Sequence, residues 1–574
     1  MLNSLKVILP KNLIISLYFF IFLFLISIIL EMLSIAIIIP LLQSLSGNSN
    51  SLIFKNIFDF INIIIGEKYN IIYIILFIVF IIFTLKNFFL IFFSYIQNKY
   101  ITTVRMYLTN KLYKIYLFQS YNFFLKNNSS ILIRNISEID LIGKYIKNLT
   151  ILINEILVFF SITFLLLIFE PIGATSVICV VGLSSFGLYK FFKKKLYILG
   201  KSRLLYSSRR LKNLQDTFGL IKEIKIYNRA ENYKKLFSHA NKQIASSEFL
   251  QSYIDSLPRY YLEWIIIIAS LFLCFLLLFL NKDTSYILTI LGLFAISAYR
   301  MLPSIIRITN SLQFIEYNKS SFNLICKELQ KKYTSGQKII NHKQIENYKS
   351  IFIKNINFSY PSASKRILNN INLKIDFGEA IGIVGESGIG KTTIINLILG
   401  LIKPTSGQVL IDNKKDIFEN IYVWQNSIGY VPQNIYLSDD TIKKNIAFGI
   451  PDDKINMTLL KKSIVQSNLS KLVKNSRLGI DTRIGEYGSK ISGGQKQRIG
   501  IARALYNDPK ILILDESTSS LDIETEKKII EEIKFLKNKK TVIIISHRLS
   551  SLKYCDSIYE LNSLGLKKIR VQEK

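Results

Sequence analysis

The sequence predicts a multidomain membrane protein, in which a six-helix all-α transmembrane domain is followed by a soluble α/β domain with a phosphate-binding loop. Three observations carry this prediction. The 574-residue chain is 50% apolar, with a mean hydropathy of +0.31, and its long apolar runs lie in the first ~310 residues. After these runs, short β-like stretches alternate with helical patterns. One stretch, Gly385–Thr392, matches the pattern G-x-x-x-x-G-K-[ST].

The apolar half contains the candidate membrane helices. A helix needs about 20 mostly apolar residues to cross a bilayer. Six segments meet or nearly meet this length, near 13–40, 70–96, 150–169, 172–192, 262–281 and 285–306. We therefore expect a transmembrane domain over 1–325, a polar, Lys-rich linker over 326–348 and the α/β domain over 349–574.

Basic residues indicate the orientation of these spans. Fourteen Lys or Arg residues lie between Lys190 and Lys235, and such an excess marks the cytosolic side of a membrane protein. The connections 97–149 and 193–261 are too long for simple loops. We expect them to continue the membrane helices into the cytosol and to turn near Tyr121–Phe124 and Ile221–Arg229.

The net charge and the cysteines exclude other classes of protein. The formal charge is +33, but Lys and Arg mostly flank apolar spans, so membrane topology explains them without a nucleic-acid partner. The sequence has four cysteines, none of them near another in sequence and none with metal-ligand spacing. Neither a disulfide framework nor a cysteine metal site is therefore expected.

The run Gly385–Thr392 follows the apolar stretch 380–384 and opens a helical stretch at 394–401, as a phosphate-binding loop requires. Its glycines let backbone N–H groups surround phosphates at a helix start. Lys391 would reach the β- and γ-phosphates, and the Thr392 hydroxyl would ligate Mg²⁺. The residues of this run expected to bind the nucleotide are Gly385, Ser387, Gly388, Gly390, Lys391, Thr392 and Thr393.

Acidic residues follow a second buried-strand pattern. The run Ile511–Leu514 ends in Asp515 and Glu516, which is a metal-holding arrangement where a phosphate loop lies elsewhere in the same domain. We expect Asp515 to hold Mg²⁺ and Glu516 to act as the general base toward water. A further strand-like run, Val542–Ile545, leads to His547.

The order of the motifs resembles one family. Ile491–Gln495 resembles the LSGGQ signature of ABC transporters, with Ile in place of the first Leu. The phosphate loop, Gln433, the signature, Asp515-Glu516 and His547 follow in the order of that family. The chain thus resembles an ABC half-transporter. The resemblance implies a six-helix transmembrane domain of ABC exporter type followed by an α/β P-loop ABC ATPase domain.

The resemblance also implies roles for single residues, with ATP and Mg²⁺ as cofactors. Tyr360 would stack on adenine, Gln433 would sense Mg²⁺ and the attacking water, and His547 would contact the γ-phosphate. The signature of one subunit would close on the ATP bound by a second copy of the chain, which implies a homodimer. The residues expected at that interface are Ser492, Gly493, Gly494, Gln495 and Asp522.

Two further segments resemble exporters and so imply outward transport. Thr482–Gly488 is similar to the T-x-V-G-E-x-G segment of exporters, and Gly219–Phe237 is similar to their second coupling region. The domain order is also that of exporters. This implies no periplasmic binding protein, and a location in a bacterial inner membrane with the ATPase domain in the cytosol.

Scattered stretches of the membrane half resemble lipid-linked oligosaccharide flippases, namely Glu31–Leu42, Leu257–Glu263 and Tyr299–Arg307. The resemblance implies a glycolipid substrate with a phosphate and a sugar headgroup. Ionisable residues inside membrane spans are costly and face cavities or partners. Arg300, Arg307 and Lys86 are therefore candidates for a substrate cavity. The alternative for each is snorkelling to the interface or an interhelix salt bridge.

Other functions remain open at this point. The same machine could carry a peptide, a drug or a lipid A-like molecule. A different class of function is an ATP-gated channel or a regulator, against which the presence of both Glu516 and His547 argues. A DNA-repair ATPase would share the phosphate loop and the signature, but the six apolar spans exclude it.

Overall fold

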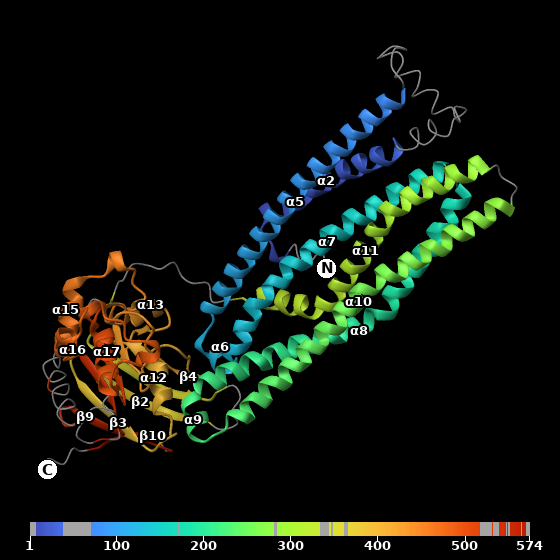
Figure 1. The fold of residues 1–574 in the computed structure, drawn as a ribbon. Helices are drawn as coiled ribbons and strands as arrows, with labels where there is room; N and C mark the ends of the chain where they lie inside the picture. The colour runs from blue at the N-terminus through green and yellow to red at the C-terminus, as the bar shows by residue number, and fades with distance from the viewer. Residues whose placement is uncertain are drawn as a thin grey trace. The chain divides into compact units, whose positions relative to one another are not determined.

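The computed structural model describes residues 7–37, 71–169, 171–279, 284–332, 344–345, 348–360, 366–516, 531, 539–546, 548, 552–563 and 565–569. The chain divides into two compact units. One comprises 1–119 with 123–335, and the other comprises 120–122 with 336–574. Figure 1 draws both units.

The first unit is helical. Its long helices are α2 (Lys11–Ala36), α5 (Ile71–Leu117), α7 (Ser129–Phe169), α8 (Pro171–Gly219), α10 (Ala230–Phe279) and α11 (Thr284–Leu329). Two short helices, α6 (Tyr121–Lys126) and α9 (Ile221–Ile226), lie at the predicted turning points. The continuation of the membrane helices through both long connections is confirmed, because α7, α8 and α10 have 41, 49 and 50 residues.

Four of these helices are long and apolar enough to span a membrane within the described residues. These spans lie within Lys11–Ser34, Leu76–Leu117, Ser129–Leu165 and Ala230–Phe279. The predicted spans 172–192 and 285–306 fall in part on side chains that the structure does not describe. The connection 43–70, between the first two predicted spans, lies outside the described residues. Helix α11 continues to Leu329, past the predicted start of the linker at 326.

The long helices pack along one another, most of them against two or more others. Helix α8 lies along α10 and α11, α7 lies along α11, and α2 packs on α5 and α7. The closest approach is at Gly200 of α8, where an added Cβ would lie 1.7 Å from the Tyr317 carbonyl oxygen of α11. A larger residue at this position would push the two helices apart, so glycine is required by the packing.

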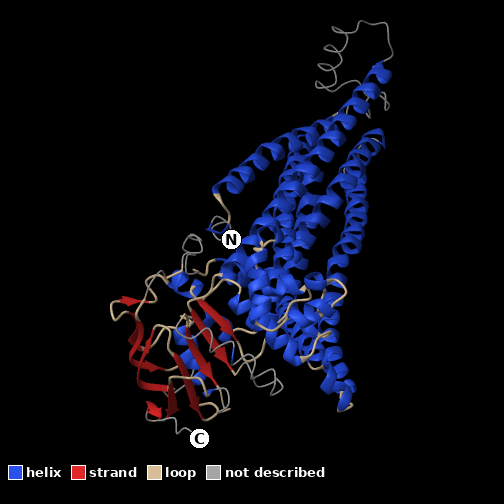
Figure 2. Ribbon diagram, turned by 90° about the vertical axis from the view of Figure 1, so that its left-hand side faces the viewer, coloured by secondary structure: helices blue, strands red, loops and turns tan. Residues whose placement is uncertain are grey.

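The second unit holds two sheets, and Figure 2 shows their strands in red. The smaller sheet is antiparallel, in the order β2 (Leu368–Asp376), β1 (Ser350–Phe358), β4 (Ser406–Ile411), β5 (Lys415–Asp416). Strand β2 alternates buried and exposed residues, as expected where one face of a sheet meets a core and the other meets water.

The larger sheet has the order β10 (Gly565–Ile569), β9 (Ser557–Asn562), β3 (Ala380–Gly385), β8 (Thr541–Ile545), β7 (Ile511–Asp515), β6 (Ile428–Val431). Strands β9, β3, β8, β7 and β6 run parallel to one another, and the edge strand β10 pairs antiparallel with β9. Every residue of β7 and β8 is buried, because both faces of a parallel sheet are covered.

The helices described in this unit are α12 (Lys391–Ile398), α13 (Ile421–Asn426), α14 (Ile442–Ile446), α15 (Met457–Gln466), α16 (Ser470–Asn475) and α17 (Gly493–Leu505). Together with the parallel strands they make the α/β domain that the sequence predicts. The fold class is therefore confirmed in both units.

Candidate functional site

Four loops meet at one edge of the larger sheet. The phosphate loop leaves the carboxyl end of β3, and Gln433 follows β6. Asp515 ends β7, with Glu516 directly after it, and Ser546 follows β8. The ends are in register, since Ile383 pairs with Ile545 and Asp515 pairs with the same residue. The carboxyl ends of parallel strands are where α/β domains bind ligands.

The phosphate loop has the backbone that its sequence predicts. Gly390 has a φ of 116° and is the N-cap of α12, and Gly388 has a φ of 80°. Few residues other than glycine adopt such angles. Among the described residues, a Cβ added at Gly388 would meet nothing within 4 Å, so the loop borders open space there. Ser387 and Thr392 are exposed beside this space, and Thr393 is buried in α12.

Lys391 is folded against its own loop. Its Nζ donates hydrogen bonds to the carbonyl oxygens of Gly385 at 2.7 Å and Glu386 at 2.9 Å. Burial lowers the pKa of Lys391, while the negative charges of Glu516 and Asp515 act in the opposite direction. The ammonium group is thus held where the start of α12 already favours an anion.

The acidic pair combines burial with backbone strain. Asp515 is 6% exposed, and the Tyr430 hydroxyl donates to its Oδ2 at 3.4 Å. Glu516 has a φ of 47°, and its N–H donates to the Ile545 carbonyl oxygen at 2.9 Å. Such a backbone costs on the order of 1–3 kcal/mol and is typical of functional sites. Gln433 Nε2 donates to Glu516 Oε2 at 2.6 Å, so the predicted sensor and the predicted base are in contact.

These groups fit a magnesium nucleotide. Within the part of the chain that the structure describes, no group of three His, Cys, Asp or Glu side chains could hold a metal alone. A site made of the Thr392 hydroxyl, the Gln433 amide and the Asp515 carboxylate offers only oxygen donors, which Mg²⁺ prefers, and leaves positions for phosphate oxygens. The open space at Gly388 would accommodate those phosphates.

The signature residues lie at the start of α17. Ser492 is the N-cap of this helix, where its Oγ accepts from Gln495 N at 3.3 Å. In return, Ser492 N donates to Gln495 Oε1 at 2.9 Å, which completes a capping box. Ser492 and Gly493 are exposed, and Gly494 and Gln495 are half-buried. The capping box therefore presents this turn on the surface of the domain.

Tyr360 lies beside the core of the domain. Its ring packs edge-on against Phe358 with 4.9 Å between the ring centroids, and it is half-buried. Its stacking on adenine stays a prediction. His547 and Asp522 lie outside the described residues.

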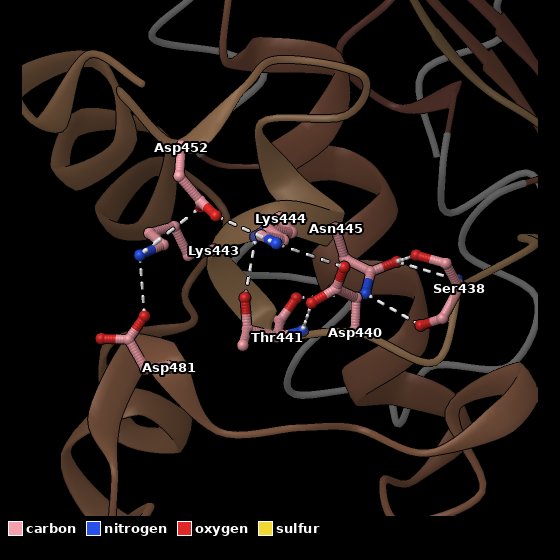
Figure 3. A network of polar contacts seen from close by, with 8 residues as sticks. All are labelled: Ser438, Asp440, Thr441, Lys443, Lys444, Asn445, Asp452 and Asp481. Atoms are coloured by element: carbon pink, nitrogen blue, oxygen red, sulfur yellow. Dashed lines mark hydrogen bonds and ion pairs between the residues drawn. The ribbon is translucent and has the colours of Figure 1, made fainter. Parts of the chain in front are cut away.

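A polar network surrounds α14, after the loop that carries Gln433 (Figure 3). Lys443 pairs with Asp481 at 2.9 Å, and Lys444 pairs with Asp452 at 3.0 Å. Thr441 caps α14 by accepting from Lys444 N at 3.2 Å. Thr441 also bridges to Arg483, so the exporter-like segment Thr482–Gly488 is attached to this network.

Sequence reasoning missed Asn445 and Arg503, which join this network to α17. Asn445 is fully buried, and Arg503 donates to its carbonyl oxygen at 2.8 Å. The sequence could have indicated a buried role for Arg503, because this residue lies in an otherwise apolar stretch, Ile499–Leu505. An arginine in such a stretch needs several hydrogen-bond acceptors.

The membrane charges are paired in the first unit. Lys86 of α5 lies 3.3 Å from Glu31 of α2, and both side chains are buried. Arg307 of α11 contacts Glu155 of α7 at 2.9 Å, through Nε and Oε1, with 43% of the arginine side chain exposed. Both contacts are interhelix salt bridges. For Lys86 and Arg307, a salt bridge of this kind is the alternative to a place in a substrate cavity. The side chain of Arg300 lies outside the described residues.

Replacing Asp515 by Asn should stabilise the protein and inactivate it. Burial, and next the charge of Glu516, raise the pKa of Asp515, so its ionised form destabilises the folded state at neutral pH. The difference in melting temperature should appear above the raised pKa. It should vanish below the ordinary pKa of an aspartate, where both states are protonated. Magnesium-dependent ATP turnover should fall on the order of 10²-fold.

Thermal unfolding across pH and ATP turnover measure the two effects. The exposed Asp439 provides a matched control, since Asp439→Asn should change neither quantity. An Asp515→Asn protein that melts at a lower temperature at neutral pH would contradict the prediction.

Comparisons with known proteins agree with this geometry. The family model described as ABC transporter matches residues 368–519. An ATP-dependent lipid A-core flippase of Cupriavidus metallidurans is 38% identical over 208 residues, which are 36% of this chain and 35% of the relative. A Staphylococcus aureus relative, provisionally named a multidrug export ATP-binding/permease protein, is 44% identical over 214 residues, which are 36% of each chain. The chain thus matches about a third of the length of these relatives.

A solved structure extends the likeness to both units. It is a bacterial Atm1-family ABC exporter with ATP bound, with a TM-score of 0.73 and 20% sequence identity, and the match covers 94% of this chain and 93% of that chain. At this identity the likeness concerns the fold alone. Together with the ABC transporter family model over 368–519, it confirms the predicted fold class, a helical N-terminal domain followed by an α/β ABC ATPase domain.

Proposed function

We propose that this chain, which carries an ABC transporter ATPase domain behind a helical membrane domain, is an ATP-driven exporter or flippase. In this proposal it works as a homodimer in a bacterial inner membrane, with its ATPase domain in the cytosol. The observation that carries the proposal is the contact of 2.6 Å between Gln433 and Glu516, at the sheet edge where the phosphate loop and Asp515 also lie. A regulator without turnover would not need a general base held in this way.

In this proposal the residues at this edge of the sheet have different roles in ATP hydrolysis. Lys391 and the N–H groups of the phosphate loop would bind the phosphates, while Thr392, Gln433 and Asp515 would hold Mg²⁺. The metal, when bound, neutralises charge on the phosphates. Glu516 accepts a proton from the attacking water, and Gln433 keeps the Glu516 carboxylate oriented. His547 would contact the γ-phosphate.

A second copy of the chain completes the site in this proposal. Ser492 and Gly494 lie on a surface turn at the start of α17, and a helix start of this kind binds phosphate oxygens. In a dimer the turn of one copy would close on the phosphates held by the loop of the other. Both sites of a homodimer would carry Glu516, so both would hydrolyse ATP.

For the cargo we propose an amphipathic lipid with an anionic headgroup, such as a lipid-linked oligosaccharide. The name of the Cupriavidus relative, a lipid A-core flippase, supports a lipid cargo. The Arg307 guanidinium contacts both carboxylate oxygens of Glu155, from Nε to Oε1 at 2.9 Å and from Nη2 to Oε2 at 3.2 Å. The Arg307 side chain is 43% exposed. A guanidinium has five N–H donors, so Arg307 retains donors for a phosphate. Arg300 would contribute further positive charge, whereas the buried Lys86 would stay paired with Glu31.

The test is lipid transfer in proteoliposomes that contain a polyprenyl-pyrophosphate oligosaccharide. We expect ATP-dependent exposure of the lipid on the opposite leaflet, which Glu516→Gln should abolish. If ATP is hydrolysed and the lipid stays in place, the exporter assignment stands and the cargo is wrong. Lipid A-like molecules, peptides and drugs are then tested in its place. If the lipid equilibrates without ATP, a channel explains the result better.

Arg307→Ala, alone and with Arg300→Ala, should lower lipid transfer and abolish stimulation of ATP turnover by the lipid. Arg307→Lys, which keeps the charge, should retain part of both. The matched control is Arg105→Ala, which breaks an exposed interhelix pair with Asp140 at 3.6 Å and should change neither quantity. If lipid transfer is unchanged in the Arg307→Ala protein, Arg307 does not bind the lipid. The salt bridge between Arg307 and Glu155 in the wild type is then purely structural.

A further inference from the structure

The segment that carries Gln433 has no regular structure of its own. Strand β6 ends at Val431 and α14 begins at Ile442, and the residues between them form neither a helix nor a ladder of strand hydrogen bonds. Gln433 is exposed near the start of this segment. Its contact with Glu516 therefore depends on what holds the backbone beyond it.

Asn445 holds one end of the segment. It is fully buried, and its Nδ2 donates to the carbonyl oxygens of Ser438 and Thr441, both at 3.1 Å. Its Oδ1 accepts from Ser438 N at 3.1 Å. Figure 3 shows the amide of Asn445 facing Ser438. The amide therefore satisfies both backbone groups of Ser438, as a paired strand would.

Arg503 holds the middle of the segment from another element. It lies on α17, the helix that begins after Ser492. Its Nη1 donates to the Tyr436 carbonyl oxygen at 3.0 Å, and its Nε and Nη2 donate to the Asn445 carbonyl oxygen and Oδ1 at 2.8 and 3.2 Å. Its guanidinium also lies 4.8 Å from the Phe448 ring centroid. One side chain thus connects the segment of Gln433 to the helix of the signature.

We propose that Arg503 and Asn445 are positioning residues for ATP hydrolysis, which tie the segment carrying Gln433 to the signature helix and so keep Gln433 against Glu516. The proposal rests on the proposed function, since it assigns a role in that reaction. It predicts an effect on the chemical step rather than on nucleotide binding, because Arg503 and Asn445 bond to the Gln433 segment and not to the phosphate loop.

The planar fork of an arginine is needed for this role. Three nitrogens of Arg503 reach three acceptors on two segments, and a lysine ammonium cannot reproduce that geometry. Arg503→Lys keeps the charge and most of the volume while it releases Tyr436. Asn445→Asp is a second variant, because it keeps the acceptor for Arg503 and loses both donors to the segment.

The test is steady-state ATP turnover of the full-length protein in proteoliposomes. Arg503→Lys should lower kcat about tenfold with KM for ATP within twofold of the wild type. The decisive measurement is a double-mutant cycle with Gln433→Ala. If Arg503 acts through Gln433, the double variant should turn over no more slowly than Gln433→Ala alone. The cycle is repeated with Asn445→Asp, which keeps the test open should Arg503→Lys fail to fold.

A matched control lies on the same helix. Arg498 is half-buried on α17 and donates to the Asn468 carbonyl oxygen at 3.4 Å, outside the segment of Gln433. Arg498→Lys should leave kcat within twofold of the wild type. Equal losses in Arg498→Lys and Arg503→Lys would show a general effect on α17 and overturn the proposal.

The other outcomes separate this inference from the proposed function. Wild-type turnover that Glu516→Gln abolishes establishes the reaction, whatever Arg503 does. Given that result, a wild-type kcat in Arg503→Lys overturns the inference alone. So do losses that multiply in the double variant, because they show that Arg503 acts independently of Gln433. Absence of turnover in the wild-type protein contradicts the proposed function itself.

Discussion

Replacing Glu516 by Gln should lower ATP turnover on the order of 10²–10⁴-fold, which is the usual contribution of a general base. The Gln side chain has the size of Glu and cannot accept the proton of the attacking water. The substitution leaves the phosphate loop and Lys391 in place, so nucleotide binding should remain. We therefore expect a dimer that stays closed on ATP.

Two measurements check this expectation. Turnover is followed by phosphate release, and closure is followed by retention of labelled ATP through gel filtration. Glu419 is exposed and provides the control, since Glu419→Gln should behave as the wild type in both assays. A Glu516→Gln protein that hydrolyses ATP normally would remove Glu516 from the role of base.

The second large effect is expected at Lys391. Lys391→Ala removes the ammonium group that bonds the carbonyl oxygens of Gly385 and Glu386 at 2.7 and 2.9 Å. It removes both of these hydrogen bonds and leaves the phosphates without their nearest positive charge. Turnover should fall on the order of 10²–10³-fold, as it does when a preorganised donor to a transition state is removed. Unlike Glu516→Gln, this variant should also bind ATP more weakly.

Nucleotide affinity and turnover, measured together, distinguish the two variants. The control is Lys403→Ala, because Lys403 is exposed and lies over the Phe418 ring, with its Nζ 5.3 Å from the ring centroid, outside the phosphate loop. Retained turnover in Lys391→Ala would contradict the assignment of the whole loop. Weak binding with normal turnover at saturating ATP would limit Lys391 to a role in affinity.

Local features of the site could be predicted because their geometry depends on neighbours in sequence. A helix directly after the glycine-rich loop follows from the phosphate-loop pattern, although the predicted stretch 394–401 begins three residues later than α12, which starts at Lys391. The burial of Ile511–Leu514 follows from a continuous apolar run. The turn at α9 follows from a connection too long for a loop and too polar for a bilayer.

Contacts between distant segments could not be predicted. Gln433 and Glu516 are 83 positions apart, and they meet because β6 and β7 are neighbours in the sheet. Lys86 and Glu31 are 55 positions apart, and only the packing of α2 on α5 shows that they are partners. The sequence marks Arg503 only as an arginine in an apolar stretch, and the structure is needed to show the three acceptors around its guanidinium.

The sequence alone determined the class of the protein, the order of its two domains and the chemistry of its phosphate-binding loop. These properties depend on composition, on periodicity and on residues that adjoin along the chain. The tertiary structure decided which motif residues touch, which membrane charges are paired and which side chains hold the Gln433 segment. These properties depend on strand order and helix packing, which arise from the burial of the whole chain and are encoded in no single segment.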